Sequence, residues 1–472
     1  AGMWLAPTIA HRNRCARDRY HDRSERKECR GQRRDQRIIR VRRDYNSWVA
    51  DETLEDYALR FAPRSFRKWS EARVAATALG SISFLALEAI GGSIMVNYGF
   101  TNAIAAILVV GVLIFLTGLP ISYYAARYNV DIDLLARGAG FGYLGSTITS
   151  LIYASFTFIF FAMEAAIMAL MFGLYVGLPL ALGYLVSSLV VIPFVLYGIT
   201  RISKFQIWTF VPWAVLAVLP FAFVAAREPQ LFREWTTFGG YSPGGTAFDP
   251  LLFGAATTVC FSLIAQIGEQ VDFLRFLPEK TPRNRKRWWA AMVIAGPGWI
   301  LPGVLKQIAG AFLAFLVIQH QFLPHRADEP TLMYLIGFSY VFSDQAIAIA
   351  AATAFVVLSQ VKINVTNAYA GSLAWSNFFS RLTHSHPGRV VWLLFNVAIA
   401  LLLMEVGLFQ ALEQVLSVYS CIAIAWIGAL VADLVINKPL GLSPPFIEFK
   451  RAHLANVNPV GVGATLVASV VS

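Results

Sequence analysis

From about residue 70 onward, the chain consists of long apolar runs separated by short polar segments. A helix needs about 20 predominantly apolar residues to cross the hydrocarbon core of a bilayer. The runs have this length and lack the strict apolar–polar alternation of membrane strands. They predict an all-α polytopic membrane protein with ten complete spans and an eleventh opening near residue 457. The ten spans are expected near 72–98, 100–125, 144–176, 179–199, 204–225, 249–271, 288–318, 344–378, 389–409 and 413–436.

The composition agrees with a membrane protein, since 57% of the 472 residues are hydrophobic and only 14% are charged. A typical soluble domain carries about 25% charged residues. The net charge of +11 is concentrated in residues 1–43, which hold 14 Lys and Arg against five Asp and Glu. We therefore expect a basic N-terminal segment, 1–55, and a transmembrane domain, 56–472. The segment is expected to contact anionic lipid headgroups or to be unrelated to the folded domain.

Lysine and arginine gather in alternate loops between the predicted spans. Short cytoplasmic loops carry this excess in membrane proteins, so the N-terminus is expected on the cytoplasmic side. The basic loops contain Arg127 and Arg137, Arg201 and Lys204, the run 275–287, Arg381 and Arg389, and Lys438, Lys450 and Arg451.

The first span contains a glycine pair, Gly91-Gly92, past its middle. Glycine lowers the cost of non-helical backbone, so the pair favours a break in the helix. Paired small residues also allow two helices to pack closely. The sequence leaves these two interpretations open.

Several ionisable residues lie within the predicted spans, where each costs on the order of 2.5–3.5 kcal/mol. Charges on separate helices can neutralise one another only if those helices surround a common polar region. The set predicts a binding or proton-handling site, or a buried ion-pair network that fixes the packing. Its members are Glu88, Glu164, Glu269, Lys306 and Lys362. Glu405, Glu413 and Asp433 lie nearer span ends and are expected to be structural.

Two predicted spans carry groups suited to a flat heterocycle. Asn364 and Asn367 are three residues apart and share one helix face. Their amides both donate and accept hydrogen bonds, as the edge of a heterocycle does. In the third span, Phe160 and Phe161 lie about one turn before Glu164, which places aromatic surface beside a hydrogen-bonding group.

No cofactor, metal or enzyme motif accompanies these residues. The four cysteines, Cys15, Cys29, Cys260 and Cys421, lack metal-ligand spacing. H-E-x-x-H, G-x-S-x-G and phosphate-loop patterns are absent. We expect no catalytic residues, no metal site and no nucleic-acid partner.

Six motifs in order resemble the nucleobase–cation symporter-1 family of purine, cytosine and hydantoin permeases, and bacterial cytosine permeases in particular. The most specific is DLLARGAGFGYLGS at 133–146, which is similar to the family's LLAR-x-x-FG-x-x-GS. The others are PRSFRKWS with Pro63, Arg67 and Trp69; the glycine pair at 91–92; DFLRF at 272–276; Asn364 with Asn367 and Tyr369; and ALVADLVI at 429–436.

The resemblance implies a LeuT-like fold of two inverted five-helix repeats, with substrate bound at midplane beside broken first and sixth helices. It also implies a bacterial-type inner membrane, and twelve spans in the family imply that the C-terminal part is truncated here. The candidate substrate-binding residues are Gly91, Gly92, Phe160, Phe161, Glu164, Gln266, Asn364 and Asn367.

Two departures from the family pattern change the expected chemistry. The family's W-F-G-x-Q reads Phe160-Phe161-Ala162-Met163-Glu164, so a carboxylate replaces an amide. Sodium-using members place a hydroxyl pair near the position of Lys362-Ile363, so in this chain an ammonium stands there and the two hydroxyl ligands are missing. We therefore expect a sodium-independent protein, with Glu88, Glu164 and Lys362 as candidate ion-coupling residues and the proton as candidate coupling ion.

The resulting hypothesis is a permease that moves nucleobases or related planar heterocycles by alternating access. The alternative is a transporter-derived receptor that binds such a ligand and signals through a C-terminal output domain. The sequence does not separate these two functions.

Overall fold

The computed structural model describes residues 54–56, 60–407 and 411–472, which belong to one compact unit, 45–472. The predicted basic segment lies outside the described residues except at its last positions, and so do Cys15 and Cys29. Within the described part, the one β pairing is an isolated bridge between Phe61 and Val130.

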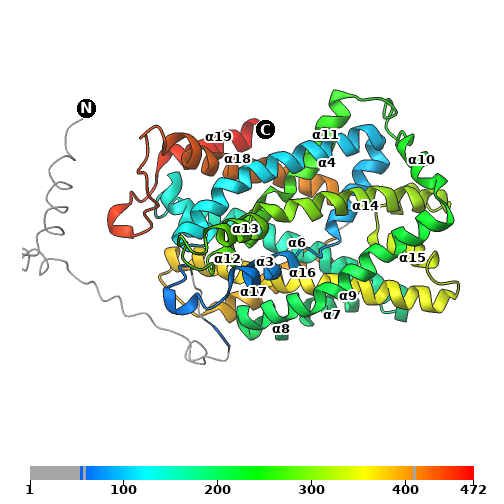
Figure 1. The fold of residues 1–472 in the computed structure, drawn as a ribbon, viewed down its shortest axis with the longest axis horizontal. Helices are drawn as coiled ribbons and strands as arrows, with labels where there is room; N and C mark the ends of the chain where they lie inside the picture. The colour runs from blue at the N-terminus through cyan, green and yellow to red at the C-terminus, as the bar shows by residue number, and fades with distance from the viewer. Residues whose placement is uncertain (1–53, 57–59, 408–410) are drawn as a thin grey trace, which may run out of the picture. The chain divides into compact units, whose positions relative to one another are not determined.

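The described helices, labelled in Figure 1, follow the predicted spans in order. They are α3 (Glu71–Gly80), α4 (Ala86–Tyr128), α5 (Ile132–Ala136), α6 (Ser146–Val176), α7 (Leu180–Leu189), α8 (Ile192–Leu196), α9 (Gly198–Arg227), α10 (Gln230–Thr236), α11 (Pro250–Phe261), α12 (Ile267–Leu274), α13 (Arg285–Ala295), α14 (Ile300–Gln319), α15 (Pro330–Ser339), α16 (Gln345–Leu382), α17 (Arg389–Glu405), α18 (Leu412–Ala432) and α19 (Pro459–Val471).

Seven helices in the described part are long and apolar enough to cross a membrane. One of them, α4, holds two predicted spans, because Gly99 has φ 76° and ψ 170° and turns the chain between them. The spans at α7–α8 and α17 form shorter apolar helices. The predicted all-α membrane architecture is therefore confirmed.

The first span is broken, but not at its glycine pair. Helix α3 ends at Gly80 and α4 begins at Ala86, so the break lies at 81–85. Two serines supply alternative bonds there: Ser81 Oγ donates to the Ala78 carbonyl at 2.7 Å, and Ser83 Oγ to the Ser359 carbonyl at 2.9 Å. Such local side-chain bonds compete with helical ones. Of the two interpretations left open for Gly91-Gly92, a break at the pair is therefore not what the structure shows.

Close packing explains the glycine pair. Gly91 and Gly92 lie buried inside α4, and a Cβ on Gly91 would stand 1.9 Å from the Gln307 carbonyl oxygen of α14. The contact is reciprocal, because a Cβ on Gly310 would stand 2.2 Å from the Glu88 carbonyl oxygen. These glycines let α4 and α14, which run side by side in Figure 1, approach backbone to backbone.

Replacing Gly91 with alanine is expected to lower the free energy of unfolding by about 1–3 kcal/mol, because the added carbon overlaps main-chain atoms that cannot rotate away. Thermal melting of the purified protein measures the loss. Gly254→Ala in α11 is the matched control, since its added carbon meets nothing within 4 Å. Equal melting temperatures for the two variants would contradict the packing role of Gly91.

The sixth span is broken in a related way. Helix α11 passes through a 3₁₀ segment, Ser262–Gln266, before α12 continues to Leu274. The described spans therefore form two sets of five, α3–α9 and α11–α18, and each set begins with a discontinuous helix. Helix α16 lies against α6 in the same way that α14 lies against α4.

The corner at Gly99 is joined to the loop before α11 by main-chain bonds. Phe100 N–H donates to the Phe238 carbonyl, Tyr241 N–H to the Val96 carbonyl and Ser242 N–H to the Asn97 carbonyl, each at 2.9 Å. This close approach also requires glycine at position 240 of the loop, because a Cβ on Gly240 would stand 2.5 Å from the Gly99 nitrogen. The two broken helices are thus connected at this end.

Candidate functional site

Glu164 lies at the break of the first span. Its Oε1 accepts the Ala86 N–H at 3.0 Å, its Oε2 accepts the Leu85 N–H at 3.1 Å, and its side chain is fully buried. Helix α4 begins at Ala86, so the carboxylate caps a helix N-terminus in the interior of the bundle. The first N–H groups of a helix have no partner within the helix, which explains why a carboxylate is held there.

One face of α16 presents amides to this break. Gln360, Asn364 and Asn367 are spaced i, i+4 and i+7, and each is at most 1% exposed. Asn367 donates to Asn364 Oδ1 at 3.1 Å, and Asn364 donates to the Phe161 carbonyl at 3.3 Å. The Gln360 amide lies beside Glu164 without a well-formed hydrogen bond, and Asn367 Oδ1 has no partner within the described residues. Gln360 was not predicted, although its spacing from Asn364 was readable.

The two phenylalanines of α6 point to different places. The Phe160 ring packs against Phe84 of the break, with ring centroids 6.4 Å apart, and against Phe156 at 4.5 Å. Phe161 belongs to a separate apolar cluster that includes Val365. Successive helical residues are turned by about 100°, so the expected joint aromatic face does not form. Phe160 alone lies beside the break.

Gln266, the candidate on the second break, is buried and donates to Glu269 Oε2 at 2.8 Å. Helix α18 packs along this 3₁₀ segment, and α6 touches it as well. Gly91 and Gly92, in contrast, contact α14 and Met333 rather than either break. The glycine pair is therefore not brought together with the other candidate residues.

Glu88 forms an ion pair with Lys306 rather than with Lys362. Glu88 Oε1 lies 2.5 Å from Lys306 Nζ of α14 and accepts the Tyr334 hydroxyl of α15 at 2.9 Å. All three residues are buried. The contacts join the α4 segment after the break to α14 and to the short helix α15.

Lys362 extends from α16 to α9. Its Nζ donates to the Gln206 carbonyl at 3.1 Å, to Gln206 Oε1 at 2.8 Å and to Thr209 Oγ1 at 2.8 Å. Among the ion pairs of the described residues, none involves Lys362. Gln206 also touches the end of α3, since a Cβ on Gly80 would stand 2.8 Å from Gln206 Cβ. Of the candidate ion-coupling residues, Lys362 is therefore held by three neutral oxygens and not by a carboxylate.

Acidic residues from two parts of the chain approach α4: Asp328 from the loop before α15, and Glu413 from α18. Glu413 of α18 accepts Ser93 Oγ at 2.5 Å and Asn97 Nδ2 at 2.8 Å. Burial, with the charges of Glu329 and Glu413 adding to it, raises the pKa of Asp328 to about 7. Glu413 thus joins α18 to α4 through two hydrogen bonds.

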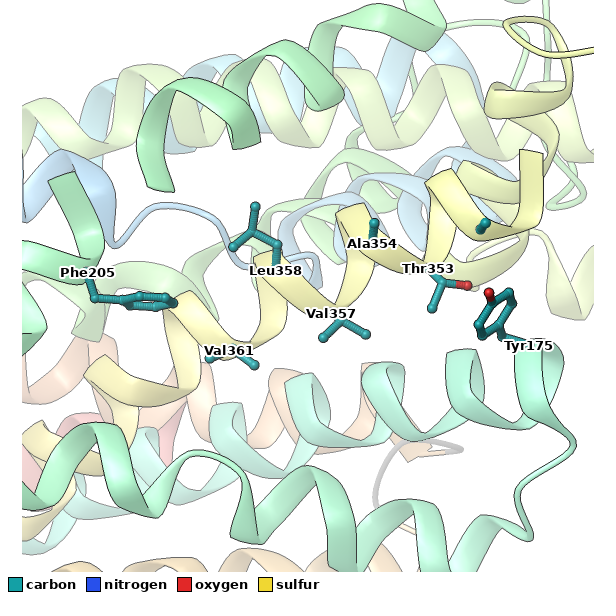
Figure 2. A pocket seen from close by; sticks show the side chains of 8 residues that line it. Tyr175, Phe205, Thr353, Ala354, Val357, Leu358 and Val361 are labelled. Carbon is teal, nitrogen blue, oxygen red and sulfur yellow. The ribbon is translucent and has the colours of Figure 1, made fainter. Parts of the chain in front are cut away.

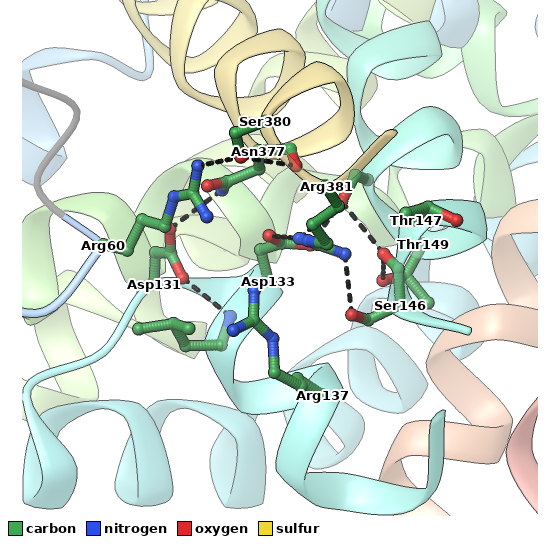
Figure 3. A network of polar contacts seen from close by, with 12 residues as sticks. Arg60, Asp131, Asp133, Arg137, Ser146, Thr147, Thr149, Asn377, Ser380 and Arg381 are labelled. Atoms are coloured by element: carbon green, nitrogen blue, oxygen red, sulfur yellow. Dashed lines mark hydrogen bonds and ion pairs between the residues drawn. The ribbon is translucent and has the colours of Figure 1, made fainter. Parts of the chain in front are cut away.

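The loop motif at 133–146 belongs to a different polar network, shown in Figure 3. Asp133 forms an ion pair with Arg381 at the end of α16, and Asn377 donates to Asp131 Oδ2 at 3.1 Å. Arg60 donates to Ser380 Oγ at 2.5 Å. The network joins the segment before α3, helix α5 and the end of α16.

The groove in Figure 2 lies elsewhere again. It has a volume of about 490 Å³ and runs along α16 between Tyr175 and Phe205. Its lining is mainly Ala, Val and Leu, with the hydroxyls of Thr353 and Tyr175 near one end. An apolar open groove of this kind suits acyl chains better than a polar heterocycle. The amide face of α16 therefore remains the candidate site.

No protein-family model matches the chain, and no curated protein matches it. Solved structures match over most of its length. Mhp1, a nucleobase-cation-symport-1 family transporter in a closed conformation with bromovinylhydantoin bound, has a TM-score of 0.64 and 16% identity over 88% of this chain and 93% of its own. A Na⁺-coupled sialic acid symporter in a substrate-bound outward-open state has a TM-score of 0.56 and 13% identity, covering 90% and 93%. A mutant of the manganese transporter of Eremococcus coleocola has a TM-score of 0.54 and 12% identity, covering 85% of each chain.

At these identities the likeness concerns the fold. The chain has the LeuT-like fold of two inverted five-helix repeats, as predicted, and it is a multi-pass integral membrane protein. The three similar proteins are described with a hydantoin, a sialic acid and a manganese ion as their respective ligands or cargo. Because one fold serves such different substrates, the substrate of this chain has to be argued from its own residues.

Proposed function

We propose that this protein is a secondary transporter that moves a neutral or cationic planar heterocycle of the nucleobase type by alternating access. Its fold is that of transporters recorded in closed and outward-open states, and one of them is described with a hydantoin heterocycle bound. The motif order in the sequence supports the same class. The end of the bundle that carries Asp133 and Arg381 is, in this proposal, the cytoplasmic end.

The unpartnered amides on α16 carry the proposal. Asn367 Oδ1 has no hydrogen-bond partner within the described residues, and the Gln360 amide has no well-formed bond beyond its contact with Glu164, although both side chains are buried. An unsatisfied buried polar group costs about 1–3 kcal/mol, so native proteins rarely leave one without a partner. A ring edge that offers both N–H and C=O groups satisfies these amides.

The surrounding groups fit the same ligand. The Phe160 ring supplies a stacking surface next to the break. Each Glu164 oxygen accepts one main-chain N–H and keeps a further lone pair for a ring N–H or an exocyclic amine. In this arrangement the ligand stacks on Phe160 of α6, and the amides of α16 form hydrogen bonds with the edge of its ring.

Asn367→Ala and Phe160→Ala are each expected to weaken heterocycle binding by roughly tenfold or more, because each removes a partner that the buried ligand cannot replace. Binding of radiolabelled uracil, cytosine, adenine and hydantoin to purified protein measures the change. Asn102→Ala is the control, since Asn102 is buried in α4 and bonds to the Tyr98 and Ala247 carbonyls away from the site. Unchanged affinity in both site variants would place the ligand elsewhere.

Reconstitution separates a transporter from the receptor alternative. Liposomes that contain the protein are expected to accumulate the heterocycle when a pH gradient is imposed. The accumulation is expected to disappear when the gradient is collapsed. Saturable binding without any uptake would favour a receptor.

A further inference from the structure

The N-terminus of α4 is an anion-binding feature that lies inside the protein. A helix N-terminus carries the equivalent of about half a positive charge and points N–H groups at whatever lies in front of it. In transporters with discontinuous helices, such half-helix ends commonly face the anionic group of a substrate. The helical segment of α4 that begins at the break runs from Ala86 to the corner at Gly99, so it has this property.

In this chain the protein itself supplies the anion. Both Glu164 oxygens accept the main-chain N–H groups of Leu85 and Ala86, at 3.1 and 3.0 Å. The side chain comes from α6, a different helix, and is 0% exposed. A second observation indicates that a ligand meets this position: on the face of α16 whose buried Gln360 amide contacts the carboxylate, the buried Asn367 Oδ1 has no hydrogen-bond partner within the described residues.

We propose that Glu164 is a specificity-determining residue that acts as a built-in anion, filling the anion position of the broken helix and excluding substrates that carry a carboxylate on the ring. The proposal rests on the proposed function for its substrate class. A ligand carboxylate would find the N–H groups already taken and would lie against a like charge, which is unfavourable by several kcal/mol in a desolvated site. A ligand with an N–H or cationic edge meets an acceptor instead.

Chemical rescue tests the anion position without any heterocycle. Glu164→Ala removes the carboxylate and leaves space in front of the Leu85 and Ala86 N–H groups. Formate is expected to fill this space and to raise the melting temperature of the variant saturably, by roughly 2 °C or more. Glu164→Gln is the matched control, because its neutral amide occupies the space and leaves no room for formate. Sodium chloride at equal ionic strength controls for salt effects.

Each result of the rescue experiment either supports or overturns the role of Glu164 as a built-in anion. Recovery of folded Glu164→Ala protein only when formate is present during preparation supports the proposal. A variant that is insensitive to formate, one that fails to fold with or without it, or an equal response of Glu164→Gln overturns it.

Paired ligands test the specificity. Orotate is uracil with a ring carboxylate, and hydantoin-5-acetate is the corresponding derivative of hydantoin. In the unmodified protein, each acid is expected to displace the bound heterocycle at least about tenfold more weakly than its neutral parent does. In Glu164→Ala, the difference in affinity between acid and parent should shrink by a similar factor. Equal competition by acid and parent in the unmodified protein overturns the proposal. If no heterocycle binds at all, the proposed function fails, and the formate result still decides the role of Glu164.

Discussion

Replacing Lys306 with methionine is expected to lower the free energy of unfolding by about 3–5 kcal/mol, because it leaves the buried Glu88 carboxylate without its cation. The two groups lie 2.5 Å apart on α14 and α4, and the Tyr334 hydroxyl alone cannot compensate the charge. Chemical denaturation of the protein in detergent, followed by tryptophan fluorescence, measures the loss.

The double variant Glu88→Gln with Lys306→Met is the informative control. It removes both charges, so most of the lost stability is expected to return, since buried ion pairs contribute little compared with neutral replacements. Tyr334→Phe should cost less than Lys306→Met, on the order of 1 kcal/mol, because it removes one hydrogen bond and no charge. A loss in the double variant equal to the sum of the losses in Glu88→Gln and Lys306→Met would show that Glu88 and Lys306 do not interact energetically.

Ligand binding and uptake are expected to be independent of sodium, because the Lys362 ammonium already occupies a group of oxygens between α16 and α9. Its Nζ has two Gln206 oxygens and Thr209 Oγ1 within 2.8–3.1 Å. A small hard cation needs several such oxygens with little positive charge nearby. Titration with sodium chloride, with choline chloride as replacement, measures the dependence.

Lys362→Thr is expected to create a saturable sodium dependence, because it removes the ammonium and adds a hydroxyl to the three remaining oxygens. Lys362→Met is the matched control, since it removes the same charge without supplying a ligand. Saturable stimulation of the unmodified protein by sodium would contradict the role assigned to Lys362. The same dependence in both variants would show that charge alone matters.

The sequence predicts the spans well, because a membrane helix is specified by the length of an apolar run and little else. It does not locate the first break, since the intrinsic tendency of Gly91-Gly92 to leave a helix fits a break and close packing equally well. The structure shows that the pair is required for contact with α14, whereas Ser83 finds a partner on α16 that no local pattern reveals.

The site was predictable where it depends on one helix and not where it depends on two. The common face of Asn364 and Asn367 follows from spacing alone, and the same spacing extends to Gln360. The partners of the charges depend on which helices meet in space. Pairing Glu88 with Lys306 and Lys362 with Gln206 requires knowing that α14 lies beside α4 and α9 beside α16.

The main-chain bonds between the corner at Gly99 and the loop before α11 have a mechanical consequence. They involve only backbone groups, and they form because glycine on the loop lets the two main chains approach. They join the far end of the first broken helix to the loop before the second. Neither of these parts can move away from the other without breaking main-chain hydrogen bonds, so a tilt of one broken helix is expected to carry the other with it.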